Sequence, residues 1–357
     1  MEQQLYHAGE LVRGYVDVRI KEEMPLLSCS AILSGTAHTR VRYTQSDGKT
    51  SHTRTAKEAH RVLCLQAPVT NFSGGVVRPG HTQYPFEFTL PANAVTSVAV
   101  FKPGGGHSCF LAYTIAVAIT APGRKQTVVH EVPLDVVAAV PPMKAAQRSE
   151  IVELNTCFCI PSGRVDLVAQ ASKNAYEGGE TPAVDYGIRN ESSRALSAVK
   201  IKIKRQVWFK ARGHQKKFKN TIVKREFDGV EAGGVFGFDG LPMRRGELPL
   251  PAVVRGPRGF QLFSIDSPTI KVRYWLKIEA TTTAECVRSA RLRLMDVQIY
   301  RTAPWRATAV FAGTERDDDD DGLAWGEVIS YEPSPDLGDV PVAVPIPSAP
   351  PVEAVRA

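Results

Sequence analysis

A short phrase that occurs twice constrains the fold of this chain more than any other feature. Tyr6-His-Ala-Gly9-Glu10 stands near the start, and Tyr176-Glu-Gly-Gly179-Glu180 follows 170 residues later. Each copy leads into alternating residues typical of a half-buried β-strand, namely Val16, Val18 and Ile20 in the first and Val184, Tyr186 and Ile188 in the second. A turn and strand repeated at this distance indicates two related β domains, because the repeats of a solenoid are several-fold shorter.

The composition places the chain among soluble, folded proteins. Its 357 residues, 43% of them hydrophobic, are enough for about two or three domains with their own cores. No apolar run approaches the roughly 20 residues that span a bilayer, and the start, Met1-Glu-Gln-Gln-Leu, lacks the basic and apolar regions of a signal peptide. We therefore expect a cytoplasmic protein.

Alternating β signals dominate from Leu11 to about Tyr300, with Gly and Pro clusters between them and no long amphipathic helix. The segment Tyr84–Leu90 is typical, since its Phe and Leu residues fall on one face and Glu87 and Thr89 on the other. The pattern predicts an all-β chain of two tandem antiparallel, immunoglobulin-like sandwiches. We expect a first domain over residues 1–140, a linker with consecutive prolines over 141–148, a second domain over 149–302, and a mostly disordered, acidic and then proline-rich tail over 303–357.

Candidate catalytic and metal-binding motifs are weak. Cys157 and Cys159 would share one face of a strand, but no second Cys or His pair has zinc spacing, so we expect reduced thiols, no metal and no disulfide framework. The run Gly104–Cys109 lacks the G-x-S-x-G elbow of a nucleophile and indicates a glycine-rich hairpin turn instead. A phosphate-binding loop is also absent from the sequence. We expect no catalytic residues and no cofactor.

The order of several motifs resembles that of the arrestin family, in particular the α-arrestin (arrestin-domain-containing) type. The first half carries Tyr6-x-x-Gly9-Glu10 and Tyr84-Pro-Phe86-Glu-Phe-Thr-Leu90-Pro91, and the second carries Tyr176-x-x-Gly179-Glu180, Asn190-Glu-Ser192-Ser193-Arg194 and Leu248-Pro-Leu-Pro251. The resemblance covers roughly residues 1–300. It implies two β-sandwiches, no catalytic activity, and work as a trafficking adaptor that joins membrane-protein cargo to ubiquitin-ligase or endocytic machinery.

Basic residues concentrate between Lys200 and Arg225 and supply more than the whole net charge of +7. Alternation in Val199-Lys-Ile-Lys-Ile-Lys puts three lysines on one face of a strand, and the following Ala211-Arg-Gly-His indicates a basic hairpin tip. Such a surface suits anionic lipid or phosphorylated cargo tails; a solvated face that resists edge pairing is the alternative. The candidate residues are Lys200, Lys202, Lys204, Arg205, Lys210, Arg212, Lys216, Lys217 and Lys219. Nucleic acid is not an expected partner, because no RNP-type motif, helix-turn-helix or zinc finger accompanies this charge.

The tail holds two candidate recruiting features. Pro347-Ser348-Ala349-Pro350 has the form of the motif that ESCRT-type sorting components recognise, and proline segments suit docking in grooves. The PPxY motif by which α-arrestins recruit HECT-type ubiquitin ligases is missing, which puts direct recruitment of such a ligase in doubt. The five aspartates Asp317–Asp321 could mask the basic surface as a pseudo-substrate, and Gly322–Tyr331 is apolar enough to dock on a sandwich or on a partner.

Two functions are consistent with these observations. In the first, the protein is a cytoplasmic adaptor, peripheral at the plasma membrane or endosomes, that binds cargo tails and reaches sorting factors through its tail. In the second, it is a stable subunit of a coat or sorting complex similar to retromer. Stoichiometric partners that survive high salt would favour the second, because obligate interfaces are larger and more apolar.

Overall fold

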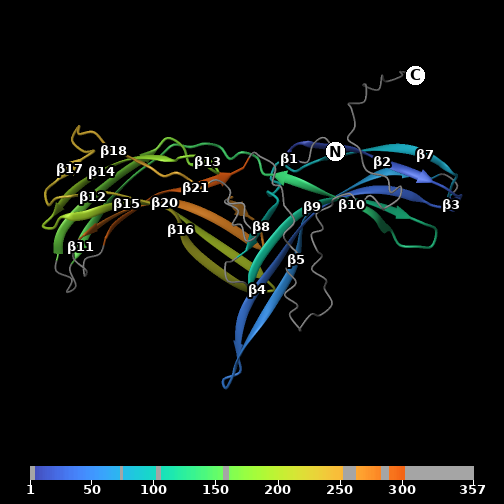
Figure 1. Ribbon diagram of the computed structural model, residues 1–357, viewed down its shortest axis with the longest axis horizontal. Helices are drawn as coiled ribbons and strands as arrows, with labels where there is room; N and C mark the ends of the chain where they lie inside the picture. The colour runs from blue at the N-terminus through green and yellow to red at the C-terminus, as the bar shows by residue number, and fades with distance from the viewer. Residues whose placement is uncertain are drawn as a thin grey trace.

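The structure, a computed structural model, describes residues 5–72, 75–101, 106–155, 161–251, 263–282 and 289–301, and these residues form strands and no helix. Figure 1 shows two β wings side by side along the long axis, with the N-terminal half on the right and the C-terminal half on the left. The predicted all-β architecture of two tandem sandwiches is confirmed.

The described N-terminal half has one large sheet with the strand order β1-β10-β9-β4-β5, to which β8 adds beside β9. Opposite it lie two small ribbons, β2 with β7 and β3 with β6. The bounds are β1 (Leu5–His7), β2 (Leu11–Ile20), β3 (Met24–Pro25), β4 (Ser28–Ser46), β5 (Ser51–Asn71), β6 (Val76–Val77), β7 (Gly80–Thr89), β8 (Val98–Phe101), β9 (His107–Thr120) and β10 (Thr127–Val137).

The described C-terminal half repeats this arrangement with two sheets. One has the order β11-β12-β14-β17 with β18 beside β14, and the other has the order β13-β21-β20-β15-β16 with β19 beside β20. The bounds are β11 (Ala146–Asn155), β12 (Pro161–Ala171), β13 (Ala175–Glu177), β14 (Ala183–Ser192), β15 (Leu196–Ala211), β16 (His214–Val230), β17 (Val235–Phe236), β18 (Arg244–Glu247), β19 (Ile265–Asp266), β20 (Ile270–Thr282) and β21 (Ala290–Tyr300).

Alternation of side chains builds the two cores. In β7, Phe86 and Phe88 are each 5% exposed, whereas Glu87 between them is exposed, as the sequence predicts. Burying an aromatic side chain of this size contributes about 1.5–3 kcal/mol. A slip by one residue would turn both rings to solvent, so the burial also fixes the register of β7 against β2.

The repeated phrase forms the same structure in both halves. The short strand β1 pairs parallel with β10, and β13 pairs parallel with β21. The glycine that follows each strand has a positive φ, +88° at Gly9 and +94° at Gly179, which a residue with a side chain adopts at a cost. The carbonyl of the next residue, Glu10 or Glu180, accepts a hydrogen bond from the amide of Leu90 or Leu250, at 2.9 Å in both cases. The two copies therefore begin two equivalent sandwiches.

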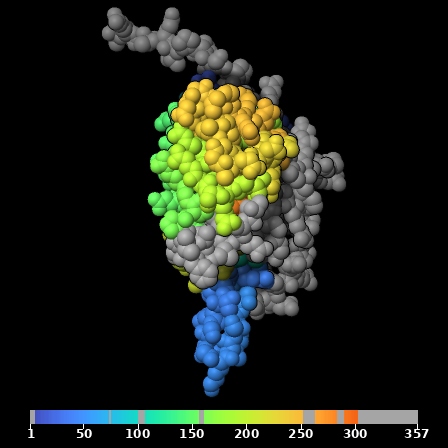
Figure 2. Space-filling model, turned by 90° about the vertical axis from the view of Figure 1, so that its left-hand side faces the viewer, coloured from blue at the N-terminus to red at the C-terminus, as the bar shows by residue number. Residues whose placement is uncertain are grey.

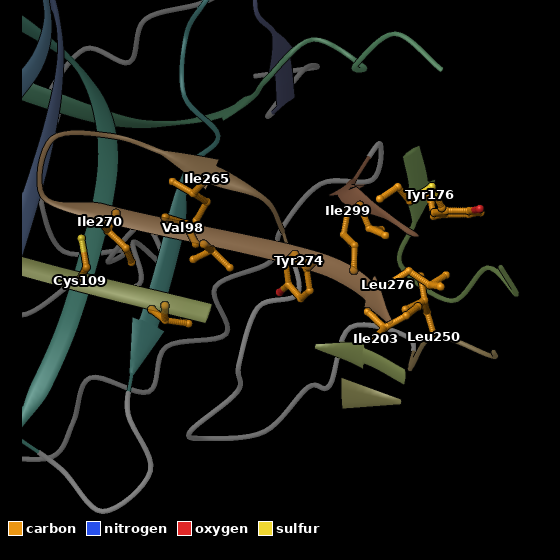
Figure 3. Packing of buried hydrophobic residues seen from close by; sticks show 14 of the residues in the cluster. Val98, Cys109, Tyr176, Ile203, Leu250, Ile265, Ile270, Tyr274, Leu276 and Ile299 are labelled. Carbon is orange, nitrogen blue, oxygen red and sulfur yellow. The ribbon is translucent and has the colours of Figure 1, made fainter. Parts of the chain in front are cut away.

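The two halves share a continuous hydrophobic core. Figure 3 shows Ile265 and Ile270 of the β19–β20 hairpin beside Val98 of β8 and Cys109 of β9, and all four side chains are at most 4% exposed. The Cys109 thiol accepts a hydrogen bond from the Thr39 hydroxyl at 3.2 Å. Burial raises the pKa of Cys109 to about 11, so the thiol at the end of the glycine-rich run stays protonated at neutral pH and serves as a core residue.

A buried ion pair ties the last described residue to the N-terminal half. The guanidinium of Arg301, 5% exposed, donates from Nη1 to Oδ2 of Asp135 in β10 at 2.9 Å and also from Nη2 to Oδ1. The Asp135 side chain is 13% exposed. A bidentate pair at this degree of burial fixes the geometry between its partners, so it joins the end of β21 to β10.

The hairpin of β4 and β5 extends well beyond its sheet. Strand β9 covers β4 only from Ser28 to Val41, so β4 and β5 continue as a two-stranded ribbon toward Ser46 and Ser51. Figure 2 shows this ribbon, in blue, projecting past the C-terminal half. Between the wings, residues 138–145 form no strand, and β11 starts at Ala146, so the last three residues of the predicted linker 141–148 belong to the strand.

Candidate anion-binding face

Strand β15 divides its side chains between the core and an outer face. Ile201 and Ile203 are fully buried, and the lysines that alternate with them, Lys200, Lys202 and Lys204, are partly exposed on the other side. The predicted lysine stripe is thus present on the outer face of the sheet. Its neighbours across β16, β20 and β21 determine what it could bind.

Register places four basic residues in one line across four strands. Lys202 of β15 lies opposite Lys224 of β16 and opposite Lys277 of β20, and Lys277 lies opposite Arg293 of β21. We call these four residues the basic row. Neighbouring strands are about 4.8 Å apart, so the row extends over about 14 Å. Like charges directly opposite each other destabilise a sheet, and this row therefore needs compensation.

A second line of residues, adjacent to the basic row, supplies part of that compensation. It consists of Glu226, Lys200, Glu279 and Arg291, again one residue per strand, and we call it the mixed row. The eight residues of the two rows carry six positive and two negative charges. The excess of four cations makes this face a candidate site for phosphate or another polyanion.

Glu279 is the central acceptor of the cluster and is only 10% exposed. Its carboxylate lies 2.5 Å from Lys202 Nζ, 3.0 Å from Arg291 Nε and 3.8 Å from Lys277 Nζ. Burial raises the pKa of Glu279, but the hydrogen bond from Lys202 and the nearby cations outweigh burial and hold the pKa below its ordinary value. One ionised carboxylate is therefore shared among three cations.

The pKa of Lys277 is also lowered, but for a lysine this shift disfavours the charged form. Burial is the main cause that lowers the pKa of Lys277, and the charges of Arg291, Lys204 and Lys202 lower it further against the effect of Glu279. A polyanion bound over the basic row would relieve this repulsion, because it would supply negative charge where the lysines crowd one another.

Two tryptophans complete the outer face. Trp275 of β20 lies opposite Lys204, and the Arg293 guanidinium is 5.3 Å from its ring centroid. Trp208 of β15 has the guanidinium of Arg273 at 5.4 Å. These cation–π contacts pack both guanidinium groups over the indole rings.

The structure places Arg205 elsewhere than the prediction did. Its side chain is on the core face, 3% exposed, and its Nε donates to Asn220 Oδ1 at 3.2 Å. It does not contribute to the outer face. The physical reason is alternation: Arg205 follows Lys204 directly and therefore points the other way.

The predicted basic hairpin tip contacts the N-terminal half. The backbone N–H of Arg212 donates to Glu58 of β5 at 2.5 Å, and the ring of His214 stacks on Tyr43 of β4 with centroids 3.6 Å apart. Ala211 is fully buried. The tip is therefore part of the contact between the halves. The basic residues predicted on this hairpin are nevertheless exposed, namely Lys210, Arg212, Lys216, Lys217 and Lys219.

Several members of the face come from outside the basic run. Lys277 lies on β20, and Arg291 and Arg293 lie on β21, far along the chain from Lys202. The alternating run Ile270-Lys-Val-Arg-Tyr-Trp-Leu-Lys-Ile carried a signal for the β20 residues, since its charged residues share one face. Two predicted tail features, Pro347–Pro350 and Asp317–Asp321, lie outside the described residues, as do Cys157 and Cys159.

A metal-binding cluster and a membrane-spanning helix are both absent from the described part of the chain. No group of His, Cys, Asp and Glu there could hold a metal ion. No helix among these residues is long and apolar enough to cross a bilayer.

The fold and the comparison with known families agree. Two tandem antiparallel sandwiches with a contact between the halves define a two-domain β-sandwich protein. The matching families are Arrestin (or S-antigen), N-terminal domain, over residues 1–140 and Arrestin (or S-antigen), C-terminal domain, over residues 161–295. The chain belongs to the arrestin family. No curated protein matches the chain.

Proposed function

We propose that the protein is a non-catalytic trafficking adaptor of the α-arrestin type. It binds cytoplasmic tails of membrane-protein cargo, and its basic row contacts anionic lipid headgroups or phosphorylated tails at the plasma membrane or endosomes. The observation that carries the proposal is the line of Lys224, Lys202, Lys277 and Arg293 across four strands. Membership of the arrestin family supports the adaptor role.

The energetics favour an anionic ligand at this face over a role in stability. Cross-strand pairs of like charge cost stability, and Glu279 offsets only part of this cost, because its single carboxylate faces three cations. A leaflet with anionic lipids attracts a basic residue near its surface by about 1 kcal/mol. Three row lysines acting together would then raise membrane partitioning about a hundredfold.

Vesicle flotation tests the proposal. We expect the native chain to float with vesicles that contain phosphoinositide and to be released by high salt, because exposed charges are screened. Replacing Lys202, Lys224 and Lys277 by Gln should lower binding about a hundredfold. The matched control replaces the exposed lysines Lys21, Lys49 and Lys125, which lie in the N-terminal half, and should bind nearly as the native chain does. Equal loss in both variants would refute a specific face.

We further propose that the tail segment Pro347–Pro350 docks an ESCRT-type sorting component and that the aspartates Asp317–Asp321 compete with membrane for the basic row. Truncation after Arg301, which keeps the ion pair between Arg301 and Asp135, should then strengthen vesicle binding. The same truncation should abolish capture of the sorting component, and Pro347→Ala with Pro350→Ala should do so without changing vesicle binding. Unchanged capture by the proline variant would remove the docking role of the motif.

A further inference from the structure

Strand β16 is the edge strand of its sheet. Among the described residues it pairs only with β15, and the sheet ends there. An edge strand presents a row of backbone N–H and C=O groups with which a further strand can pair. With 17 residues, β16 is about three times as long as an average strand, so this edge offers room for a long added segment.

The hydrophobic core is less completely covered along this edge than further inside the sheet. The core-facing residues Ile201, Ile203 and Phe209 of the neighbouring strand β15 are at most 1% exposed. The large apolar residues of β16 that pack against the core are only partly buried, namely Phe218, Ile222, Val223 and Phe227. A strand added beside β16 would remove part of this apolar surface from water, which contributes about 25 cal/mol per Å².

The charge of β16 determines which kind of strand can pair with it. From His214 to Arg225 the strand carries five cations and no carboxylate. The five cations are Lys216, Lys217, Lys219, Lys224 and Arg225. Lysines on an edge oppose pairing with a strand of like charge, so the edge of a second copy is disfavoured and an acidic strand is attracted.

The chain itself contains an acidic segment that is followed by strand-forming residues. Asp317–Asp321 comes directly before Gly322–Tyr331, and both segments lie outside the described residues. Neither contains proline, and the second is rich in the aromatic and β-branched types that are enriched in strands, namely Trp325, Val328, Ile329 and Tyr331. Acidic charge and apolar residues therefore occur together in the tail, where they complement the cations and apolar residues of β16.

The tail starts within reach of this edge. Register sets Val297 of β21 in line with Asn220 of β16, across β20 and β15, and three strand spacings amount to about 14 Å. Arg301, where the described chain ends, follows Val297 by four residues. The 15 residues of 302–316 span up to about 50 Å, so Asp317 can reach every cation of β16.

We propose that residues 317–331 of this chain add to the sheet as an edge strand beside β16, with the aspartates against its cations and the apolar residues against Phe218 and Phe227. The added backbone pairs with the exposed edge, and the aspartates offset the positive charge there. The docked strand covers the end of the basic row at Lys224 and leaves the inner strands of the row open. The consequence for membrane binding rests on the proposed function, whereas the docking itself does not.

Hydrogen exchange followed by peptide mass spectrometry tests the docking without any membrane. The test compares the full chain with a chain truncated after Arg301, which keeps the ion pair to Asp135. The amides of β16 should exchange at least about fivefold more slowly in the full chain, because pairing protects the N–H groups of the edge. The control is β5, the edge strand of the N-terminal sheet, which should exchange equally in both chains. Equal exchange of β16 in both chains would overturn the proposal.

Two variants of the full chain separate a paired strand from a loose ionic contact. In the first, all five residues of Asp317–Asp321 are replaced by Asn, and in the second Trp325→Ser is combined with Ile329→Ser. Each variant should return β16 to the exchange rate of the truncated chain, because strand addition needs both the charge and the apolar contacts. Slow exchange that persists in the second variant would show that the aspartates are counterions only and would refute the added strand.

Carbodiimide crosslinking, which joins a carboxylate to a nearby amine, locates the tail. Within single chains, the aspartates should couple to the lysines of β16 in preference to the exposed Lys21, Lys49 and Lys125 of the N-terminal half. Couplings found only in covalent dimers would place the tail on a second copy and overturn the arrangement within one chain. If the full chain does not float with vesicles, the proposed function fails, while exchange and crosslinking still decide the docking.

Discussion

The ion pair between Arg301 and Asp135 yields a quantitative prediction about how the two halves unfold. We consider Asp135→Asn, which keeps the shape of the side chain and removes its charge. The side chain of Arg301 is 5% exposed and that of Asp135 is 13% exposed. The substitution therefore leaves the buried guanidinium of Arg301 without the carboxylate that accepts its two hydrogen bonds. Removing one partner of a buried pair costs about 3–5 kcal/mol.

We expect the lower end of that range, about 3 kcal/mol, because Arg301 Nη2 keeps the carbonyl of Val136 at 3.4 Å. Because the unfolding entropy is about 2.1 cal/mol/K per residue, the change lowers the melting temperature of a single cooperative unit of this size by about 4–5 °C. Differential scanning calorimetry should show one transition for the native chain, because the cores of the halves are continuous, and a broader or split transition for Asp135→Asn.

Two controls make the prediction specific. Arg13→Ala removes an exposed pair with Glu87, whose side chains are 42% and 55% exposed, and should cost less than about 1 kcal/mol. The double variant Asp135→Leu with Arg301→Met should recover most of the stability, since an apolar pair leaves no buried charge. A loss below about 1 kcal/mol for Asp135→Asn would refute the reasoning that this pair joins the halves.

Three further predictions concern stability and reactivity. Asn190→Ala should lower the unfolding free energy measured in urea by about 2–4 kcal/mol, because the side-chain amide of Asn190, a residue only 1% exposed, donates to three backbone carbonyls. A loss below about 1 kcal/mol would contradict this role. Iodoacetamide at pH 8 should label exposed Cys64 in the native protein but label Cys29 and Cys109 only after unfolding, since burial raises the pKa of each to about 11; equal labelling would contradict the burial. Burial raises the pKa of Glu279, but the neighbouring cations outweigh burial and hold this pKa below 4.5. The stabilising effect of Glu279 is therefore complete above pH 4.5 and is lost as the pH falls through the folded-state pKa. Glu279→Gln should flatten the dependence of the unfolding free energy on pH in that range, and an unchanged slope would count against the cluster.

The duplicated fold could be predicted because its determinants are local. The turn at Gly9 and Gly179 and the alternation around Phe86 are written in consecutive residues, and both reappear in the structure as expected. The lysine stripe on β15 was predictable for the same reason. Alternation also implied that Arg205 is buried. The prediction nevertheless placed Arg205 on the basic surface, because it counted the charge of the whole segment without separating the two faces of the strand.

The rest of the candidate site depends on contacts between distant parts of the chain. The basic row exists only because β15 pairs with β20 in the register that sets Lys202 opposite Lys277, and nothing near Lys202 in the sequence specifies that register. The docking of the hairpin tip is of the same kind, since His214 meets Tyr43 of the other half. Charge composition therefore predicted a basic outer face, while long-range pairing determined which side chains lie on it.

The most direct test of the central claim compares two double variants of equal charge in vesicle flotation. Lys202→Gln with Lys277→Gln changes the basic row, and Lys216→Gln with Lys217→Gln changes the exposed hairpin that the sequence also suggested. If the row binds the anion, the first variant loses binding to phosphoinositide vesicles about thirtyfold and the second stays close to the native chain. If the hairpin variant loses binding and the row variant keeps it, the basic row is not the anion-binding site.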